Sequence, residues 1–410
     1  MNIRPLYAYF TATGSWFLAF GLQSVLFAYL VTLVLNESAE KVGFAQMAYL
    51  LPGTLFILLG GSVADHYGGR RVALIGQALA ATLALCLAIT MWFTDLTYTL
   101  FVLFAIAMGC AQAIVTPARD GLLPLVAEGQ IQRRVVQASM IQFGTQMIGL
   151  LLASLTDGLG AIVMLAGQSA ILSLGVIAYS KLSLPTKPAA ALEISVAKQL
   201  RFMVVEGFKS VLRSPPMRMV VMQNVAMALF FMGSYIVTMP LLIREVYGGN
   251  AESLSWVNAA NSLGLFIAIL ILLRYGDIKR QGRALVLSQG IGALILALAG
   301  FNWGFEILVI TLFFWGTCGG VAMTMSRTIM QEHAPEDQRG RMMAFYAFSF
   351  MGAGPLGALL SGYLVTWFGP LAALQLSSVA MFIVSIIVFI EGHLWNLGRT
   401  PRSSIHPNDH

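Results

Sequence analysis

The most distinctive polar run in the chain is GSVADHYGGRR at residues 61–71, which joins two apolar segments. Asp65 ends the first segment, where a carboxylate can pair with a cation or with the positive N-terminal end of a neighbouring helix. Gly68 permits a tight turn, and Arg70 and Arg71 are suited to lipid headgroups on one membrane face. Acid, turn and bases in this order predict ion pairing at a helix end, and an ordinary short basic loop is the alternative.

A degenerate copy of this run, RYGDIKRQGR, follows at residues 274–283 and would pass for an ordinary basic loop if taken alone. Its acid, Asp277, lies 212 positions after Asp65, and Arg280 and Arg283 supply its bases. Other residues repeat at offsets between 208 and 211 positions, namely Pro124 with Pro335, Gly144 with Gly352, and Gly149 with Gly357. The near-constant offset predicts two related halves.

Inside the apolar segments the polar residues are amides and aromatic rings. Trp16, Phe20, Gln23 and Phe27 follow one another at spacings of 4, 3 and 4 and share one helix face. An ionised group at mid-bilayer would cost about 2.5–3.5 kcal/mol, and this chain avoids that cost. The further candidates for a substrate cavity are Gln112, Gln142, Gln146, Asn258 and Asn261. Together they would suit an amphiphilic molecule; interhelical hydrogen bonding and aromatic packing are the alternative.

Composition makes lipid the relevant solvent. Of the 410 residues, 58% are hydrophobic and 10% charged, with a mean hydropathy of +0.79, whereas soluble domains carry about 25% charged residues. Only helices and closed barrels satisfy every backbone amide in a bilayer. Long unbroken apolar runs, such as residues 100–115 and 305–321, predict helices.

A span needs about 20 apolar residues, and twelve such runs are present. They are Tyr7–Leu33, Val42–Ala64, Val72–Trp92, Thr97–Pro117, Val136–Thr156, Ala161–Ser180, Met219–Ile243, Leu254–Leu273, Ala284–Phe301, Phe305–Ser326, Met343–Trp367 and Leu371–Phe389. The predicted domains are a six-helix bundle over 1–180, a linker over 181–218, a second six-helix bundle over 219–392 and a tail over 393–410.

Charge predicts the topology of these spans. With the N-terminus inside, 22 of the 24 Lys and Arg residues fall on the cytoplasmic side, and only Lys41 and Arg244 fall outside. Both termini and the linker are therefore expected in the cytoplasm, with residues 196–212 as an amphipathic helix on the membrane surface. The net charge of +6 follows from this rule, so no nucleic-acid partner is expected.

Residues 61–71 resemble motif A of the major facilitator superfamily. The stretches TPARDGLLP at 116–124 and QEHAPEDQRGR at 331–341 look like the subgroup that includes the enterobactin exporter and macrolide efflux proteins. The resemblance covers nearly the whole chain. It implies an all-α integral membrane fold in which two pseudo-symmetric bundles of six helices enclose a central cavity.

The resemblance also implies alternating access, one bundle rocking against the other. The residues expected to latch the cytoplasmic side are Gly61, Asp65, Gly68, Arg70, Arg71 and Arg119, with Asp277, Arg280 and Arg283 as their second-half counterpart. Proton antiport is implied by the family, but two positions do not support it. Ala105 stands where many antiporters place an arginine, and Leu150 stands where their Gly-Pro pair has its proline. Gly69 also replaces a basic residue that motif A usually carries.

The function expected is secondary transport, because no Walker A sequence is present to bind ATP. Export of an amphiphilic small molecule, such as a siderophore or drug, is favoured. Nutrient uptake and lysophospholipid flipping by the same fold stay open. The protein is expected to be a monomer in the inner (plasma) membrane, with a small-molecule substrate, protons as a further partner and no cofactor.

An intramembrane enzyme is the alternative from a different class. Catalysis would need convergent groups, and the sequence contains no HExxH zinc motif and no GxSxG nucleophile motif. All five histidines lie in loops or in the tail. The cysteines, Cys86, Cys110 and Cys318, lie inside apolar runs without metal-ligand spacing, so neither a metal site nor an enzyme is expected.

Overall fold

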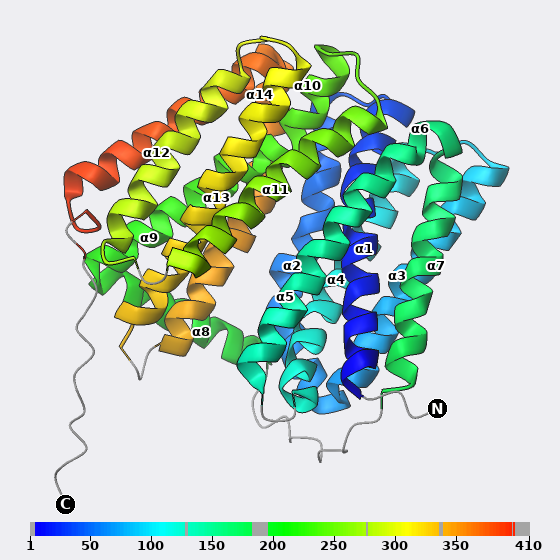
Figure 1. Cartoon of the computed structure of the whole chain (residues 1–410), viewed down its shortest axis with the longest axis horizontal. Helices are drawn as coiled ribbons and strands as arrows, with labels where there is room; N and C mark the ends of the chain where they lie inside the picture. The colour runs from blue at the N-terminus through cyan, green and yellow to red at the C-terminus, as the bar shows by residue number, and fades with distance from the viewer. Residues whose placement is uncertain are drawn as a thin grey trace, which may run out of the picture.

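A computed structural model describes residues 5–127, 130–182, 196–275, 278–335, 339–395 and 397. Within these ranges, the side chains of residues 57–65, 132, 196–204, 275 and 339–341 lie outside the description. The described residues form helices joined by short loops and contain no strand (Figure 1).

The first bundle is built from consecutive helices near the N-terminus. They are α1 (Pro5–Tyr29), its π-wound extension η1 (Leu30–Val34), α2 (Ala39–Tyr67), α3 (Gly69–Phe93), α4 (Tyr98–Val126), α5 (Ile131–Leu152), the short η2 (Ala153–Leu155) and α6 (Thr156–Leu159), and α7 (Ala161–Ser180). Helix α8 (Val196–Arg213) then leads to the second bundle. It packs against that bundle through Phe208, whose ring lies 5.7 Å from the ring of Phe345.

The second bundle begins with one irregular helix. This helix comprises α9 (Pro215–Ala226), the π-wound η3 (Met227–Met232) and η4 (Ser234–Thr238), and α10 (Met239–Glu245). It is followed by α11 (Ala251–Tyr275), α12 (Gln281–Ala299), α13 (Phe305–His333) and α14 (Arg339–Glu391). Helix α14 bends back at Gly369, whose φ of 78° and ψ of 165° are not helical. Its two arms therefore form two separate membrane spans.

The twelve predicted spans are confirmed. Ten helices among the described residues are long and apolar enough to cross a bilayer, and the one over Met342–Glu391 counts as two crossings. Helix α2, 29 residues long and described only in part at 57–65, completes the set. The two pseudo-symmetric six-helix bundles stand side by side in Figure 1.

Glycines allow the helices within each bundle to approach closely. A Cβ on Gly149 of α5 would overlap the carbonyl oxygen of Leu18 on α1. At the predicted equivalent position, a Cβ on Gly357 of α14 would lie 2.5 Å from the carbonyl oxygen of Ala228 on η3. Small residues at helix crossings are the usual means of association in lipid, where burial alone gives little. The same contact therefore recurs in both halves.

One polar contact has a counterpart in the other half as well. Arg70 donates from Nε to Tyr179 O at 2.9 Å and from Nη2 to Ser180 O at 2.7 Å, at the C-terminal end of α7. In the second half, Arg283 donates from Nε to Trp395 O at 3.0 Å, just beyond α14. A cation at a helix C-terminus is favourable because that end carries partial negative charge. In each half, an arginine in the first turn of the helix after the basic loop thus binds the backbone at the end of the last helix or just beyond it.

The bundles meet through α2 with α14, α5 and η2 with α11, α1 with α11, and η1 with α10. We call the end of the molecule where α1 begins and α8 lies the linker end, and the opposite end the far end. Described contacts between the bundles run from the far end to the middle, where Thr54 Oγ1 donates to Met351 O at 2.6 Å. In Figure 1 the two bundles diverge toward the linker end.

Candidate substrate path

A small pocket opens inside the first bundle, between α1, α2, α3, α4 and α7. The side chains that line it include Trp16, Phe20, Gln23, Tyr49, Gln112 and Gln168. Its volume is about 20 Å³, which is room for one water-sized group. Three of the predicted cavity residues, Trp16, Gln23 and Gln112, therefore share one pocket.

The amides of this pocket bond to one another across helices. Gln168 Nε2 donates to Gln23 Oε1 at 2.6 Å, and the Tyr49 hydroxyl donates to Gln112 Oε1 at 2.5 Å. Gln23 Nε2 and Gln168 Oε1 are buried and have no hydrogen-bond partner among the described residues. A buried polar atom without a partner costs about 1–3 kcal/mol, so a water or a ligand group is expected to bind here.

The second bundle holds a comparable cluster on its π-wound helix. The Tyr235 hydroxyl donates to Asn258 Oδ1 at 2.7 Å, and the Trp315 ring lies 5.4 Å from Phe231 and 6.1 Å from Tyr235. Trp315 Nε1 is a buried donor with no described partner. Since π-turns occur often at functional sites, this cluster of Phe231, Tyr235, Asn258 and Trp315 is a candidate for substrate contact.

A groove of about 280 Å³ lies between the bundles where α5 faces α11. Phe143 and Gln146 line it from the first bundle, and Ser262 and Phe266 line it from the second. The rings of Phe143 and Phe266 lie 5.6 Å apart. This groove brings Gln146, another predicted cavity residue, to the interface of the bundles.

The remaining cavity candidates lie elsewhere. Asn261 donates from Nδ2 to Leu312 O at 3.3 Å and so joins α11 to α13. Gln142 is half-buried on α5 and lines neither the pocket nor the groove. A single cavity shared by Gln23, Gln112, Gln142 and Asn261 stays a prediction.

The latch residues are described only in part. The side chains of Gly61 and Asp65 lie outside the described residues, and so does Asp277. Gly68 ends α2 with a φ of 88°, a backbone conformation that favours glycine, as a tight turn requires. Arg71 and Arg280 are exposed.

Arg119 is buried at the linker end of α4. Its Nη2 donates to Asp120 Oδ1 at 2.9 Å, and its guanidinium carbon lies 4.5 Å from the centre of the Phe17 ring. Nη1 has no hydrogen-bond partner among the described residues. A buried cation retains a cost unless its donors are satisfied, so Arg119 has the capacity to bind a second acceptor.

Sequence reasoning missed Tyr49, Gln168, Tyr235 and Trp315. Each is an aromatic or amide residue within a predicted span, so residue type was an available signal. Their partners are far away in the chain, however, and nothing local identifies them. In the second bundle, the π-turns also rotate later residues relative to an ideal α-helix, which defeats simple spacing arguments.

Comparison with known proteins places the whole chain among membrane transporters. A model of the Major Facilitator Superfamily matches residues 8–248 and 221–408. The multidrug efflux pump Tap of Mycolicibacterium fortuitum is 23% identical over 385 residues, covering 90% of each chain. The staphyloferrin A transporter of Staphylococcus aureus is 23% identical over 388 residues, covering 92% of each. The enterobactin exporter EntS of Salmonella choleraesuis is 23% identical over 394 residues, covering 90% of this chain and 88% of its own.

Solved structures show the same fold at lower sequence identity. The nucleoside transporter NupG superposes with a TM-score of 0.69 at 15% identity, covering 95% of this chain and 99% of its own. A POT family transporter in complex with 5-aminolevulinic acid gives a TM-score of 0.73 at 12% identity, covering 94% and 96%. These similarities concern the arrangement of helices alone.

Proposed function

The chain belongs to the major facilitator superfamily, and on that premise we propose that it exports an amphiphilic small molecule by alternating access. It is a multi-pass membrane transporter with a small-molecule substrate. Direction, substrate class and mechanism are the parts that we propose.

Two clusters of rings and amides carry the proposal on substrate. One is the pocket around Trp16, Gln23 and Gln168, and the other surrounds Tyr235 and Trp315. Each contains buried polar atoms without a described partner. Aromatic faces bind the apolar part of a ligand, and free amide and indole groups bind its oxygens. A substrate such as a siderophore or drug offers both, and the relatives that are named as exporters act on such molecules.

Contacts between the bundles support alternating access. They lie in the far half and at the middle of the molecule, as with Thr54 and Met351. We infer a state closed at the far end. With 22 of 24 basic residues on the side of the linker, we assign the linker end to the cytoplasm, and the protein to the inner membrane as a monomer.

The latch also belongs to this proposal. Arg119, with its unpartnered Nη1, would bind Asp65 when the linker end closes, with Gly61, Gly68, Arg70 and Arg71 shaping the loop. In the second half, the counterpart residues would also stabilise the closed linker end, with a smaller contribution; they are Asp277, Arg280 and Arg283. Protons are the proposed coupling ion, because many members of the family are proton antiporters. Ala105 and Leu150 do not support this assignment, since they replace an arginine and a proline that such antiporters carry. Uptake is the alternative direction.

The test is transport into inverted membrane vesicles. Vesicles that contain the protein should accumulate a labelled hydroxamate or catecholate siderophore, or a cationic drug, when a proton gradient is imposed. Replacing Trp315 with Phe and Gln168 with Leu should each weaken saturable uptake while the protein stays in the membrane. Accumulation in right-side-out vesicles alone would instead establish uptake, and no accumulation of any of these molecules in either orientation would overturn the substrate class.

A further inference from the structure

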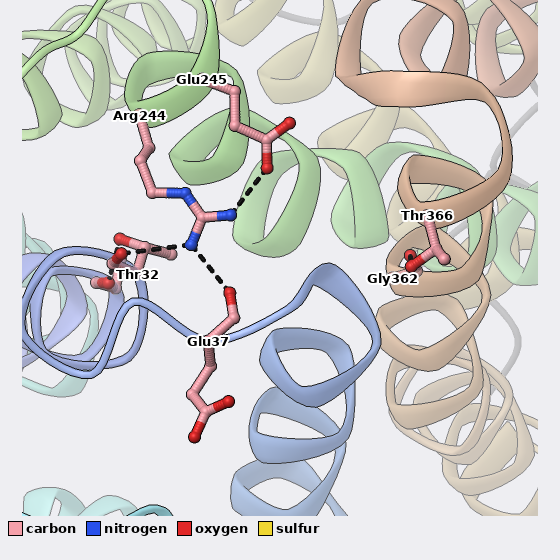
Figure 2. Close-up of polar contacts among 7 residues, drawn as sticks. Thr32, Glu37, Arg244, Glu245, Gly362 and Thr366 are labelled. Atoms are coloured by element: carbon pink, nitrogen blue, oxygen red, sulfur yellow. Dashed lines mark hydrogen bonds and ion pairs between the residues drawn. The ribbon is translucent and has the colours of Figure 1, made fainter.

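Arg244, at the far end of the second bundle, reaches across to the first bundle. Its Nη1 donates to Thr32 O at 3.2 Å and to Glu37 O at 2.7 Å, and its Nη2 pairs with Glu245 at 2.7 Å. Figure 2 shows the guanidinium between Glu245 and the chain that leaves η1. Asn36, with a φ of 48°, turns that chain. Arg244 is therefore a cation on the carbonyl end of a helix, where partial negative charge accumulates.

Asp157, at the far end of the first bundle, makes the opposite contact. Its Oδ1 accepts from the backbone amide of Ala251 at 3.2 Å, and its Oδ2 accepts from the amide of Glu252 at 3.0 Å. These amides are the first two of α11, and Asn250 caps the third through Ser253 N at 3.0 Å. The first amides of a helix have no partner within the helix, so Asp157 supplies from the other bundle what α11 lacks.

The two contacts form a reciprocal pair. Each bundle gives one charged side chain to the helix end of opposite partial charge on the other bundle. Arg244 is also one of only two basic residues on the side opposite the linker, against the usual charge asymmetry. The second, Lys41, pairs with Glu37 at 2.8 Å within its own bundle.

We propose that Arg244 and Asp157 together form the gate of the far end and set the equilibrium between its closed and open states. The inference rests on the proposed alternating access. Both contacts exist when the bundles meet at the far end, and both are lost when they separate there. Neither contact needs a partner side chain on the other bundle, so separation exposes to water only two charged side chains and the backbone groups at two helix ends, all of which water can bind.

Paired spin labels at exposed far-end positions measure this equilibrium without any substrate. Phe93→Cys on the first bundle and Trp303→Cys on the second, both exposed, are labelled after the three native cysteines are replaced by alanine. Arg244→Gln and Asp157→Asn should each raise the ratio of long to short distances roughly tenfold, the effect of losing a hydrogen bond to a charged group. Arg244→Lys should give a smaller rise because it keeps the charge and loses the planar fork.

Matched controls make the same charge changes at residues whose side chains make no described contact with the other bundle. Lys41→Gln removes the other outer cation, and Asp95→Asn removes an exposed carboxylate near the same end; both should leave the distances unchanged. If Arg244→Gln and Asp157→Asn also leave them unchanged in folded protein, the gate is refuted even where transport persists. A shift in distances without any transport by the wild type would support the gate and count against the proposed substrate.

Discussion

Helices within a bundle and helices across the bundle interface pack in different ways. Within the bundles, backbones touch: a Cβ on Gly21 would overlap Gln146 O, and a Cβ on Gly264 would overlap Phe313 O. Across the interface, the described hydrogen bonds join a side chain to a backbone group, as Gln46 Nε2 does with Ile236 O at 3.2 Å.

This difference separates the rigid parts of the molecule from the surface along which they move. Close-packed backbones leave no room for small adjustments, so each bundle is expected to move as one body. A side-chain hydrogen bond contributes only about 0.5–1.5 kcal/mol net, and water can replace it at a helix end. The contacts between the bundles are therefore strong enough to hold the far end closed and weak enough to let it open.

The largest expected effect comes from disturbing a contact within a bundle. Gly21→Val places a branched side chain against the α5 backbone, and overpacking of this kind costs about 1–3 kcal/mol or more. We expect a clear fall in the thermal unfolding temperature of purified protein and low yield. Gly167→Val on α7, where a Cβ would meet nothing within 4 Å, is the matched control. Equal stability of the two variants would contradict the rigid-bundle interpretation.

Gly43 of α2 tests a close glycine contact across the interface, where Gly362 of α14 faces it. A Cβ there would lie 2.7 Å from Ala358 O and 3.1 Å from the Cα of Gly362, both on α14. Gly43→Val should therefore leave each bundle folded and prevent closure of the far end. Cysteines placed at the far end should react faster with an impermeant thiol reagent, by about tenfold or more for a cost of 1.4 kcal/mol or above. A lower unfolding temperature with unchanged reactivity would mean that this glycine serves folding instead.

Thr54→Val should have a smaller effect of the same kind. It removes the hydrogen bond to Met351 O, worth about 1 kcal/mol, so the closed state should lose roughly a fivefold preference. The same assay of cysteine reactivity at the far end measures this loss. Thr82→Val, which removes a hydrogen bond to Ala78 O within α3, should leave the reactivity unchanged. An equal change in both variants would show that the effect does not depend on the interface between the bundles.

Arg70→Gln should have the smallest effect, confined to one bundle. The change removes the cation from the end of α7, and such an interaction is worth about 0.3–1 kcal/mol when exposed. Hydrogen exchange should speed up in the last turn of α7 and stay constant in α11. Faster exchange in both helices would show that the linker-end loop communicates with the far end.

The fold was predictable because its signals are local. Continuous apolar runs determine the spans, and Gly68 marks the turn after α2 because few other residues accept its φ of 88°. The candidate site was predictable only in part. Trp16, Gln23 and Gln112 share a pocket, yet the pairing of Tyr235 with Trp315 depends on helices 80 positions apart and on π-turns that the residue types do not indicate. Nothing in the sequence near Asp157 reveals that its partners are amides of α11.

The contact of Asp157 with α11 gives the molecule a built-in reporter of its conformation that hydrogen exchange can read. The amide protons of Ala251 and Glu252 are held by that carboxylate, whereas the amide of Ser253 is held by Asn250 of the same segment. Solvent exchange at the first two positions should therefore follow the separation of the bundles, while exchange at the third reports only local fraying. A peptide that begins at or before residue 248, so that both amides lie beyond its first two residues, would record the conformational cycle by mass alone, in protein without a spin label and in a native membrane.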